Sequence, residues 1–176
     1  MTDRRIRRTR RTLHDALLTL VLEKGYERIT VQDILDRADI GRSTFYAHYR
    51  DKDALLLSSF EDLSEQIQAE LGPAPSADPA RPAEVLFSHA HRHRRIYRAL
   101  CGHQGGAVVH RHLHRLIGDL LRAHLGPPRA GIDVDVAAEF YTSAALGLLL
   151  WWVDQGFPHD AAWLTAAYRK LATGGT

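Results

Sequence analysis

A pair of short helical patterns separated by three residues is the feature that most limits how this chain can fold. The first pattern begins with a capping box, because the Thr30 side chain can accept a hydrogen bond from the backbone of Asp33. A tight break at residues 39–41 follows, and a second short helix is predicted over Arg42–Tyr49. Two short helices joined by so brief a turn form a helix-turn-helix.

Helical spacing of apolar residues continues on both sides of this motif. A preceding helix is predicted to end at Lys24-Gly25, and Asp51 is a suitable N-cap for a longer helix that ends near Gly72. Four prolines within residues 72–82 predict a loop or linker, and further helices are predicted over about 83–100, 107–125, 134–155 and 160–172. The predicted fold class is all-α, with a three-helix helix-turn-helix domain (residues 1–51) followed by a helical effector-binding and dimerisation domain (residues 52–176).

The positive charge of the chain is concentrated at its front. Residues 1–52 hold 12 of the 23 lysines and arginines but only 8 of the 21 acidic residues, and six arginines within residues 4–11 form a basic arm. Such a block often contacts a polyanion, although it can also be a solvated tail. The single cysteine, the lack of a secretory signal and the short apolar stretch at 144–153 predict a cytoplasmic protein with no membrane partner.

The start of the second short helix carries the residue types that read DNA bases. Arg42 can hydrogen-bond guanine with two donors, and Ser43 and Thr44 can contact several bases. Tyr46, His48 and Lys52 lie where side chains can reach phosphates. The aromatic residues Phe45 and Tyr49 are interpreted as core residues instead.

The linked spacings around this motif resemble the N-terminal domain of the tetracycline-repressor (TetR) family. The match covers roughly residues 9–60 and includes Gly25-Tyr26, residues 30–34, residues 38–49 and residues 52–56. The resemblance implies operator DNA as a partner, a homodimer built by the last two long helices, and Thr30, Arg42, Ser43, Thr44, Tyr46, His48 and Lys52 as DNA-binding residues. A helix-turn-helix that binds protein or RNA is the alternative.

Two positions depart from the family pattern. The usual glycine of the turn is Asp39, which tolerates a left-handed backbone better than most residues. The usual N-cap serine is Gly41, which has no side chain with which to cap. These departures leave the turn geometry open.

The second half of the chain predicts a sensor. An apolar cavity between helices would hold an unknown small organic effector, and the candidate contacts are His89, Tyr97, Cys101, Tyr141 and Trp151. The helix predicted over residues 134–155 is apolar nearly all round in its second half, so it must be buried on more than one side. A dimer interface that includes Leu148, Trp152, Trp163, Leu164 and Leu171 would satisfy it, and a monomer that buries this helix internally is the alternative.

The eleven histidines leave a metal- or pH-responsive regulator open. His89 with His93, and His110 with His114, share helix faces at i, i+4 spacing, but no local carboxylate or cysteine completes either pair. We therefore predict no metal site and no cofactor. No nucleophile, base and oxyanion-hole pattern is identifiable, so the chain is predicted not to be an enzyme.

Overall fold

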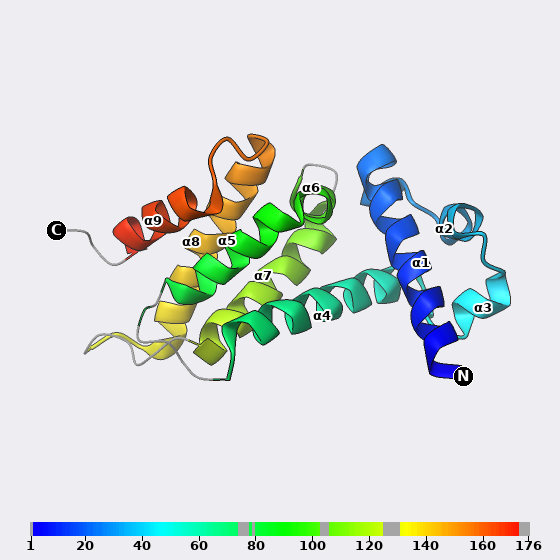
Figure 1. Ribbon diagram of the computed structural model, residues 1–176, viewed down its shortest axis with the longest axis horizontal. Coiled ribbons are helices and arrows are strands. Elements are labelled where there is room, and N and C mark those ends of the chain that lie inside the picture. Colours follow the sequence, from blue (N-terminus) through cyan, green and yellow to red (C-terminus); the bar gives the residue numbers. More distant parts are fainter. Residues whose placement is uncertain (1, 74–77, 79, 103–105, 125–130, 173–176) are drawn as a thin grey trace.

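The computed structural model describes residues 2–73, 78, 80–102, 106–124 and 131–172, which are all helix, turn or loop (Figure 1). The all-α fold class predicted from the sequence is confirmed for these residues. The elements are α1 (Thr2–Lys24), a 3-10 helix η1 (Tyr26–Arg28), α2 (Val31–Ala38), α3 (Arg42–Tyr46), α4 (Lys52–Leu71), α5 (Arg81–Arg92), α6 (Arg94–Cys101), α7 (Gly106–His124), α8 (Val134–Asp154) and α9 (Ala161–Ala172).

Helix α4 joins two groups of helices. Figure 1 shows α2 and α3 beyond α1 at one end of the molecule, and α4 extending from α1 to the bundle of α5–α9 at the other. The bundle is held mainly by the packing of α7 on α8 and of α5 on α9, and α6 packs against both α1 and α8. One continuous apolar core therefore runs through both groups. The domain boundary at residue 51 stays a prediction.

Local signals in the sequence produce the helix ends that they predict. The Thr30 side chain accepts from the Asp33 backbone N–H and the Asp33 side chain accepts from the Thr30 backbone N–H, which completes the capping box of α2. The Asp51 side chain accepts from the Ala54 N–H at 2.7 Å and caps α4, which ends at Gly72. Asp39 adopts the left-handed conformation, with φ 52° and ψ 48°, and its N–H bonds the Leu35 carbonyl.

The arginine-rich segment is helical, which corrects its description as an arm. Helix α1 runs unbroken from Thr2 to Lys24, so residues 4–11 form its first turns. Arginine has a high helix propensity and the segment contains no glycine or proline, so nothing in it interrupts the helix.

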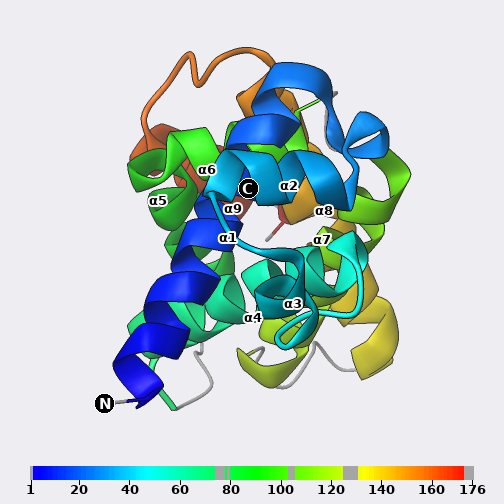
Figure 2. The ribbon, with the colours of Figure 1, turned by 90° about the vertical axis from the view of Figure 1, so that its right-hand side faces the viewer.

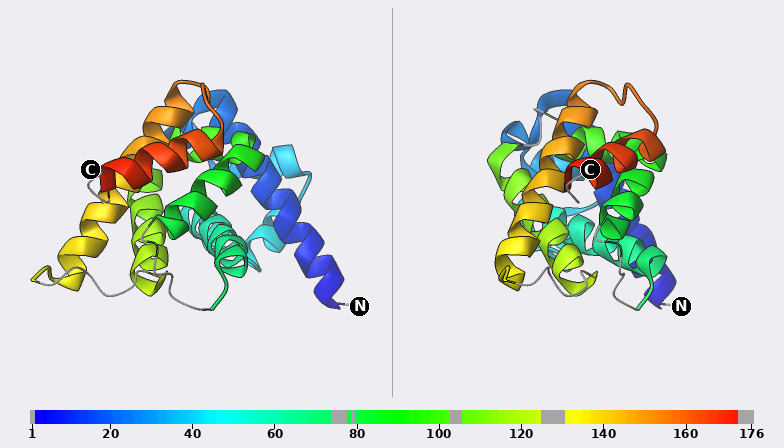
Figure 3. Two further views of the ribbon diagram at one scale, coloured as in Figure 1. Left: turned by 60° about the vertical axis from the view of Figure 1, so that its left-hand side comes forward. Right: turned by 90° about the vertical axis from the view of Figure 1, so that its left-hand side faces the viewer.

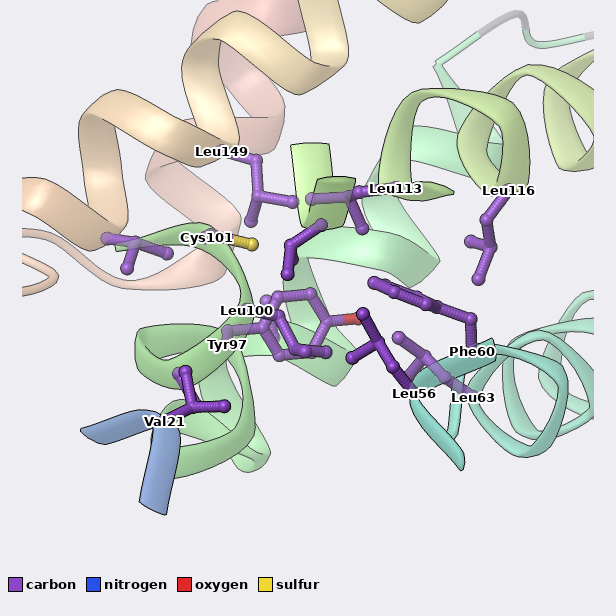
Figure 4. Packing of buried hydrophobic residues seen from close by; sticks show 14 of the residues in the cluster. Val21, Leu56, Phe60, Leu63, Tyr97, Leu100, Cys101, Leu113, Leu116 and Leu149 are labelled. Carbon is purple, nitrogen blue, oxygen red and sulfur yellow. The ribbon is translucent and has the colours of Figure 1, made fainter. Parts of the chain in front are cut away.

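The single helix predicted over residues 83–100 is two helices. The backbone leaves helical geometry at His93, with φ −114° and ψ 41°, and α6 starts at the next residue. This break turns α6 so that Tyr97, Leu100 and Cys101 are buried in the core (Figure 4). The prolines at 75, 79 and 127, which marked predicted loops, lie outside the described residues.

By length and composition α8 could cross a membrane, which the sequence analysis did not anticipate. This is weak evidence, because a core helix of a soluble protein meets the same criteria. Residues spread along α8 are buried against its neighbours, including Ala138, Ala145, Leu149 and Trp152.

The left-handed backbone of Asp39, in the turn between α2 and α3, allows a prediction about the free energy of unfolding. Replacing Asp39 with valine should lower the free energy of unfolding by about 1–2 kcal/mol, because a β-branched residue is strained in the left-handed region. Asp39→Gly should be at least as stable as the parent, since glycine adopts this conformation freely. Urea unfolding followed by circular dichroism measures both, and a valine variant as stable as the parent would contradict the αL assignment.

Candidate nucleic-acid interface

The start of α3 presents an exposed polar face. Gly41 caps the helix through its backbone, because its carbonyl accepts from the N–H groups of Thr44 and Phe45. Arg42, Ser43 and Thr44 are all exposed, whereas Phe45 is fully buried and anchors the helix in the core. The Arg42 guanidinium donates to the Gln32 side chain of α2 at 2.8 Å, which orients it across the turn. The three side chains predicted to read bases therefore lie together on one open surface.

The first turns of α1 lie beside this surface, which the sequence analysis missed. A shallow groove of about 310 Å³ is lined by Arg5, Ile6 and Thr9 from α1 and by residues of the α3 region, which are Ser43, Thr44, Ala47 and His48. Figure 2 shows the two helices on the same end of the molecule. The run of arginines was the available signal, but only the packing of α1 indicates which of them adjoin α3.

Tyr46 and His48 follow the polar face at the end of α3. The Tyr46 ring is about half exposed and packs edge-on against buried Phe45, at 5.4 Å between ring centroids. His48 is half-buried and lies in the groove beside α1. Both side chains can reach a polyanion laid along this surface, so the predicted phosphate contacts remain open to them.

Thr30 is exposed at the start of α2, where its hydroxyl donates to the Asp33 carboxylate at 2.6 Å. The Lys24 ammonium lies 2.7 Å from the same carboxylate and, together with the Thr30 hydrogen bonds, holds the pKa of Asp33 well below its usual range. Thr30 is thus committed first to capping, and its DNA contact stays a prediction.

Lys52 has a structural role that the sequence did not indicate. Its ammonium donates to the Ile29 carbonyl at 2.9 Å and to the Tyr26 carbonyl at 3.1 Å, and it lies 4.6 Å from the centre of the Tyr26 ring. The Tyr26 hydroxyl donates to Asp53, and burial together with this carboxylate raises the tyrosine pKa. A phosphate contact by Lys52 would have to compete with these bonds between α4 and the loop before α2.

Buried polar groups connect the end of the α3 region to α1 and α4. The Tyr49 hydroxyl accepts from the Arg10 guanidinium at 3.0 Å and lies 3.2 Å from His14 Nε2 and 3.3 Å from the Ser58 hydroxyl. His14 Nδ1 lies 3.2 Å from the Asp62 carboxylate of α4. Burial lowers the pKa of His14, although Asp62 opposes the shift. This network ties the position of α3 to that of α4.

Three of the five predicted effector contacts meet in the core of the bundle. His89 Nδ1 lies 3.2 Å from the Tyr97 hydroxyl and His89 Nε2 lies 3.3 Å from the Gln66 side chain of α4. Cys101 lies one turn after Tyr97 on α6, and burial raises the pKa of both side chains. Figure 4 shows the Tyr97 hydroxyl among apolar side chains, including Leu56, Phe60 and Leu113.

The other two predicted contacts lie elsewhere. Trp151 is 43% exposed on α8 and does not join this cluster, so its role as an effector contact stays a prediction. Tyr141 is half-buried on α8, and its carbonyl accepts from the Tyr168 hydroxyl of α9. The sequence could not separate these residues because α8 is apolar on most of its circumference.

The predicted histidine pairs have different surroundings in the structure. His89 and His93 stack with centroids 4.3 Å apart, and His114 Nε2 lies 3.2 Å from the Glu139 carboxylate. Within the part of the chain that the structure describes, no group of three His, Cys, Asp or Glu side chains could hold a metal ion.

The residues predicted at a dimer interface divide into two sets. Trp152 and Leu164 are fully buried within the chain, so their prediction as partner contacts is wrong. Trp152 packs against Phe87 and Phe157 and donates to the His159 carbonyl. By contrast, Trp163 and Leu171 are exposed, and Leu148 is half-buried. Neighbouring tryptophans on a helix face different sides, and the sequence did not reveal which one faces inward.

Two family profiles match the chain. Residues 13–58 match the bacterial regulatory proteins of the tetR family, and residues 80–174 match a transcriptional regulator C-terminal region. The first match contains the second half of α1, α2, α3 and the start of α4, and the second contains α5–α9.

Individual proteins are similar to this chain as well. The HTH-type transcriptional regulator YxbF of Bacillus subtilis is 32% identical over 170 residues, which cover 89% of this chain and 42% of that protein. The repressor KstR of Rhodococcus jostii is 28% identical over 83 residues, or 47% of this chain and 39% of that protein. The chain thus spans less than half the length of these curated relatives.

Solved structures share the fold over most of the chain. A TetR transcriptional regulator from Streptococcus agalactiae has a TM-score of 0.72 at 24% identity and covers 97% of both chains. FadR from Bacillus subtilis, in complex with stearoyl-CoA, has a TM-score of 0.69 at 16% identity and covers 94% of this chain and 98% of its own.

The polar cluster in the bundle predicts a dependence of stability on pH. Burial, reinforced by His93, lowers the pKa of His89 to about 4, so the folded chain resists a proton that the unfolded chain accepts below about pH 6.5. Stability is therefore full above that pH and decreases as the pH falls towards 4. The contribution of His89 amounts to about 2 kcal/mol between pH 7 and pH 5.

Urea unfolding of the parent and of His89→Gln across this pH range measures the contribution. The amide can retain hydrogen bonds to Tyr97 and Gln66 but does not titrate, so the variant should lose less stability on acidification. Parallel pH curves for the two proteins would contradict the buried neutral histidine.

Proposed function

Because this chain belongs to the TetR family of bacterial regulatory proteins and is a DNA-binding transcriptional regulator, we propose that it is a homodimeric, effector-responsive repressor of a near-palindromic operator. The observation that carries the proposal is the exposed start of α3, where Arg42, Ser43 and Thr44 form one polar face beside Arg5 of α1. We place the regulator in the cytoplasm, where its operator would be.

In this proposal the two ends of the α3 region have different tasks. Arg42, Ser43 and Thr44 read base edges in the major groove, and Tyr46, His48 and Arg5 contact the phosphates on either side. The buried ring of Phe45 and the bonded hydroxyl of Tyr49 keep the helix fixed during docking. Thr30 and Lys52 support the arrangement mainly by holding α2 and α4 in position.

The unpartnered face of α8 and α9 supports the homodimer. Val136, Phe140, Gly147 and Trp151 are exposed at helical spacing along α8, and Trp163 is exposed on α9. Such a contiguous apolar face is unusual on a monomer but suits a symmetric partner. Covering it with a second copy also accounts for the apolar character of α8 without a membrane.

Helix α4 is the proposed route from effector to operator. Its second half contributes Gln66 and Leu63 to the cluster around His89 and Tyr97, and its first half contributes Ser58 to the network that holds Tyr49. An effector that displaced α4 would move the two recognition helices of a dimer apart, and half-sites one helical turn apart tolerate little such movement.

The names of similar proteins support the remaining elements of the proposal. KstR is described as a repressor, and FadR proteins of the same fold were solved with stearoyl-CoA and lauroyl-CoA. These relatives favour repression and a small organic effector with a long apolar part. His89, Tyr97 and Cys101 are among the polar groups in the core that could orient an effector.

Selection of bound sites from random DNA, followed by binding to the selected site, tests the operator proposal. Arg42→Ala should weaken specific binding by about tenfold or more and relax the preference at one base pair, because a bidentate contact to a base is lost. Binding to random DNA should change much less. Arg122→Ala, which removes an arginine from the far end of α7, is the control. Equal loss in both variants, or no selected palindrome, would contradict the proposal.

The dimer proposal is tested at Gly147, where an added side chain would meet no atom of its own chain. Gly147→Glu should weaken the dimer by about a hundredfold or more, because a carboxylate would be buried without a partner at the interface. Sedimentation over a range of concentrations measures this effect. Ala123→Glu, on an exposed position of α7, should leave the dimer intact. A Gly147→Glu dimer of parent strength would exclude this face as the interface.

A further inference from the structure

A large groove separates the first half of α1 from α4. Its volume is about 1500 Å³, and its walls come from α1 between Arg4 and Leu18 and from α4 between Ser59 and Ala69, with Ile96 and Leu100 of α6 at one end. Figure 3 shows the N-terminal half of α1 diverging from α4, which opens this space. The groove is separate from the shallower one that adjoins α3, although Arg5 borders both.

The α1 wall of the groove is strongly basic. Arg4, Arg8 and Arg11 follow one another at i, i+4 and i+7, so they lie on one face of the helix. All three are exposed, and their guanidinium groups make no hydrogen bond or ion pair with any residue that the structure describes. This contrasts with Arg10, which is committed to Tyr49 and Ser58.

The end and floor of the groove are apolar. Leu18 of α1, Leu63 of α4, and Ile96 and Leu100 of α6 line it, and Ala69 borders its other end. Leu63 and Leu100 are buried core residues, whereas Leu18 and Ile96 are only partly covered. The exposed parts of Leu18 and Ile96, beside these arginines, form an apolar surface that a ligand of matching character would cover.

Three carboxylates, two on α4 and one on α1, oppose the arginines. Asp62 is already paired with His14 at 3.2 Å, and Glu65 is exposed, while Asp15 lies on α1 itself. Six arginines border the groove against these three carboxylates, so its net charge is positive. The α1 side of the groove is therefore the side that attracts an anion, away from Glu65.

We propose that this groove binds an amphipathic anion. Its phosphate or carboxylate accepts hydrogen bonds from Arg4, Arg8 and Arg11, and its apolar chain covers Leu18 and Ile96. Arginine suits this task because its planar fork matches both oxyanions. The site is distinct from the interior cluster of His89 and Tyr97, from which it is separated by Leu63 and Gln66.

Occupation of the groove would also affect DNA binding, a consequence that rests on the proposed function. Neutralising the α1 arginines would remove positive charge from the end of the molecule that carries α3. The ligand site itself requires no operator, so it is tested without DNA.

The test is isothermal titration calorimetry of the full chain with decyl phosphate below its micelle-forming concentration. Inorganic phosphate and decanol test the two halves separately, and decanoate distinguishes a carboxylate from a phosphate headgroup. Decyl phosphate or decanoate should bind at least about tenfold more tightly than inorganic phosphate or decanol alone. Binding no tighter than that of inorganic phosphate or decanol would overturn the proposal.

Two variants locate the binding in this groove. Arg8→Gln with Arg11→Gln should weaken binding by about tenfold or more, because charge-assisted hydrogen bonds are lost. Ala69→Trp, at an exposed position, should weaken it by filling the groove without removing charge. Arg111→Gln with Arg115→Gln removes the same charge from α7 and should leave binding unchanged. Parent affinity in both groove variants would overturn the proposal, and this result does not depend on whether an operator is found.

Discussion

The structure depends on the burial of one face of α4 along nearly its whole length. Leu55, Leu56, Phe60, Leu63 and Ile67 are each at most 4% exposed, and each such side chain contributes about 1.5–3 kcal/mol when removed from water. Along its length α4 packs against α1 of the first group and against α5 and α7 of the bundle. Because α4 is one continuous helix from Lys52 to Leu71, both groups of helices pack against the same element.

The exposed face at the start of α3 is held in position by side chains inside the protein. Phe45 fills the core behind α3, and the Tyr49 hydroxyl holds Arg10, His14 and Ser58 in one network. Lys52 closes the loop before α2 through backbone carbonyls. Within the described residues, the exposed side chains of Ser43 and Thr44 make no hydrogen bond, and Arg42 bonds only Gln32. Side chains with few hydrogen bonds on a fixed backbone can adapt to base edges at little cost in backbone entropy.

The arginines of α1 line two grooves because the helix is exposed on two sides. Arg5 adjoins α3, whereas Arg4, Arg8 and Arg11 face the groove along α4. A flexible arm would have presented all six arginines to one polyanion. The continuous helix instead divides them by the angle of about 100° between successive residues, and so creates a second basic surface.

The sequence by itself determined most of the helices, the caps at Thr30 and Asp51 and the polar face of α3, but not the break at His93 that separates α5 from α6. The Thr30 capping box and the Asp51 cap depend on atoms within four residues, so local chemistry suffices to predict them. The turn geometry at Asp39 was left open by the sequence, and the structure shows that its backbone is left-handed. Only the tertiary structure decided that Trp152 faces the core while Trp151 faces outward, and that Lys52 holds a loop. It also brought His89, Tyr97 and Gln66 together. These outcomes depend on how helices far apart in the chain pack, and an almost uniformly apolar helix such as α8 carries no local signal of which side packs inward.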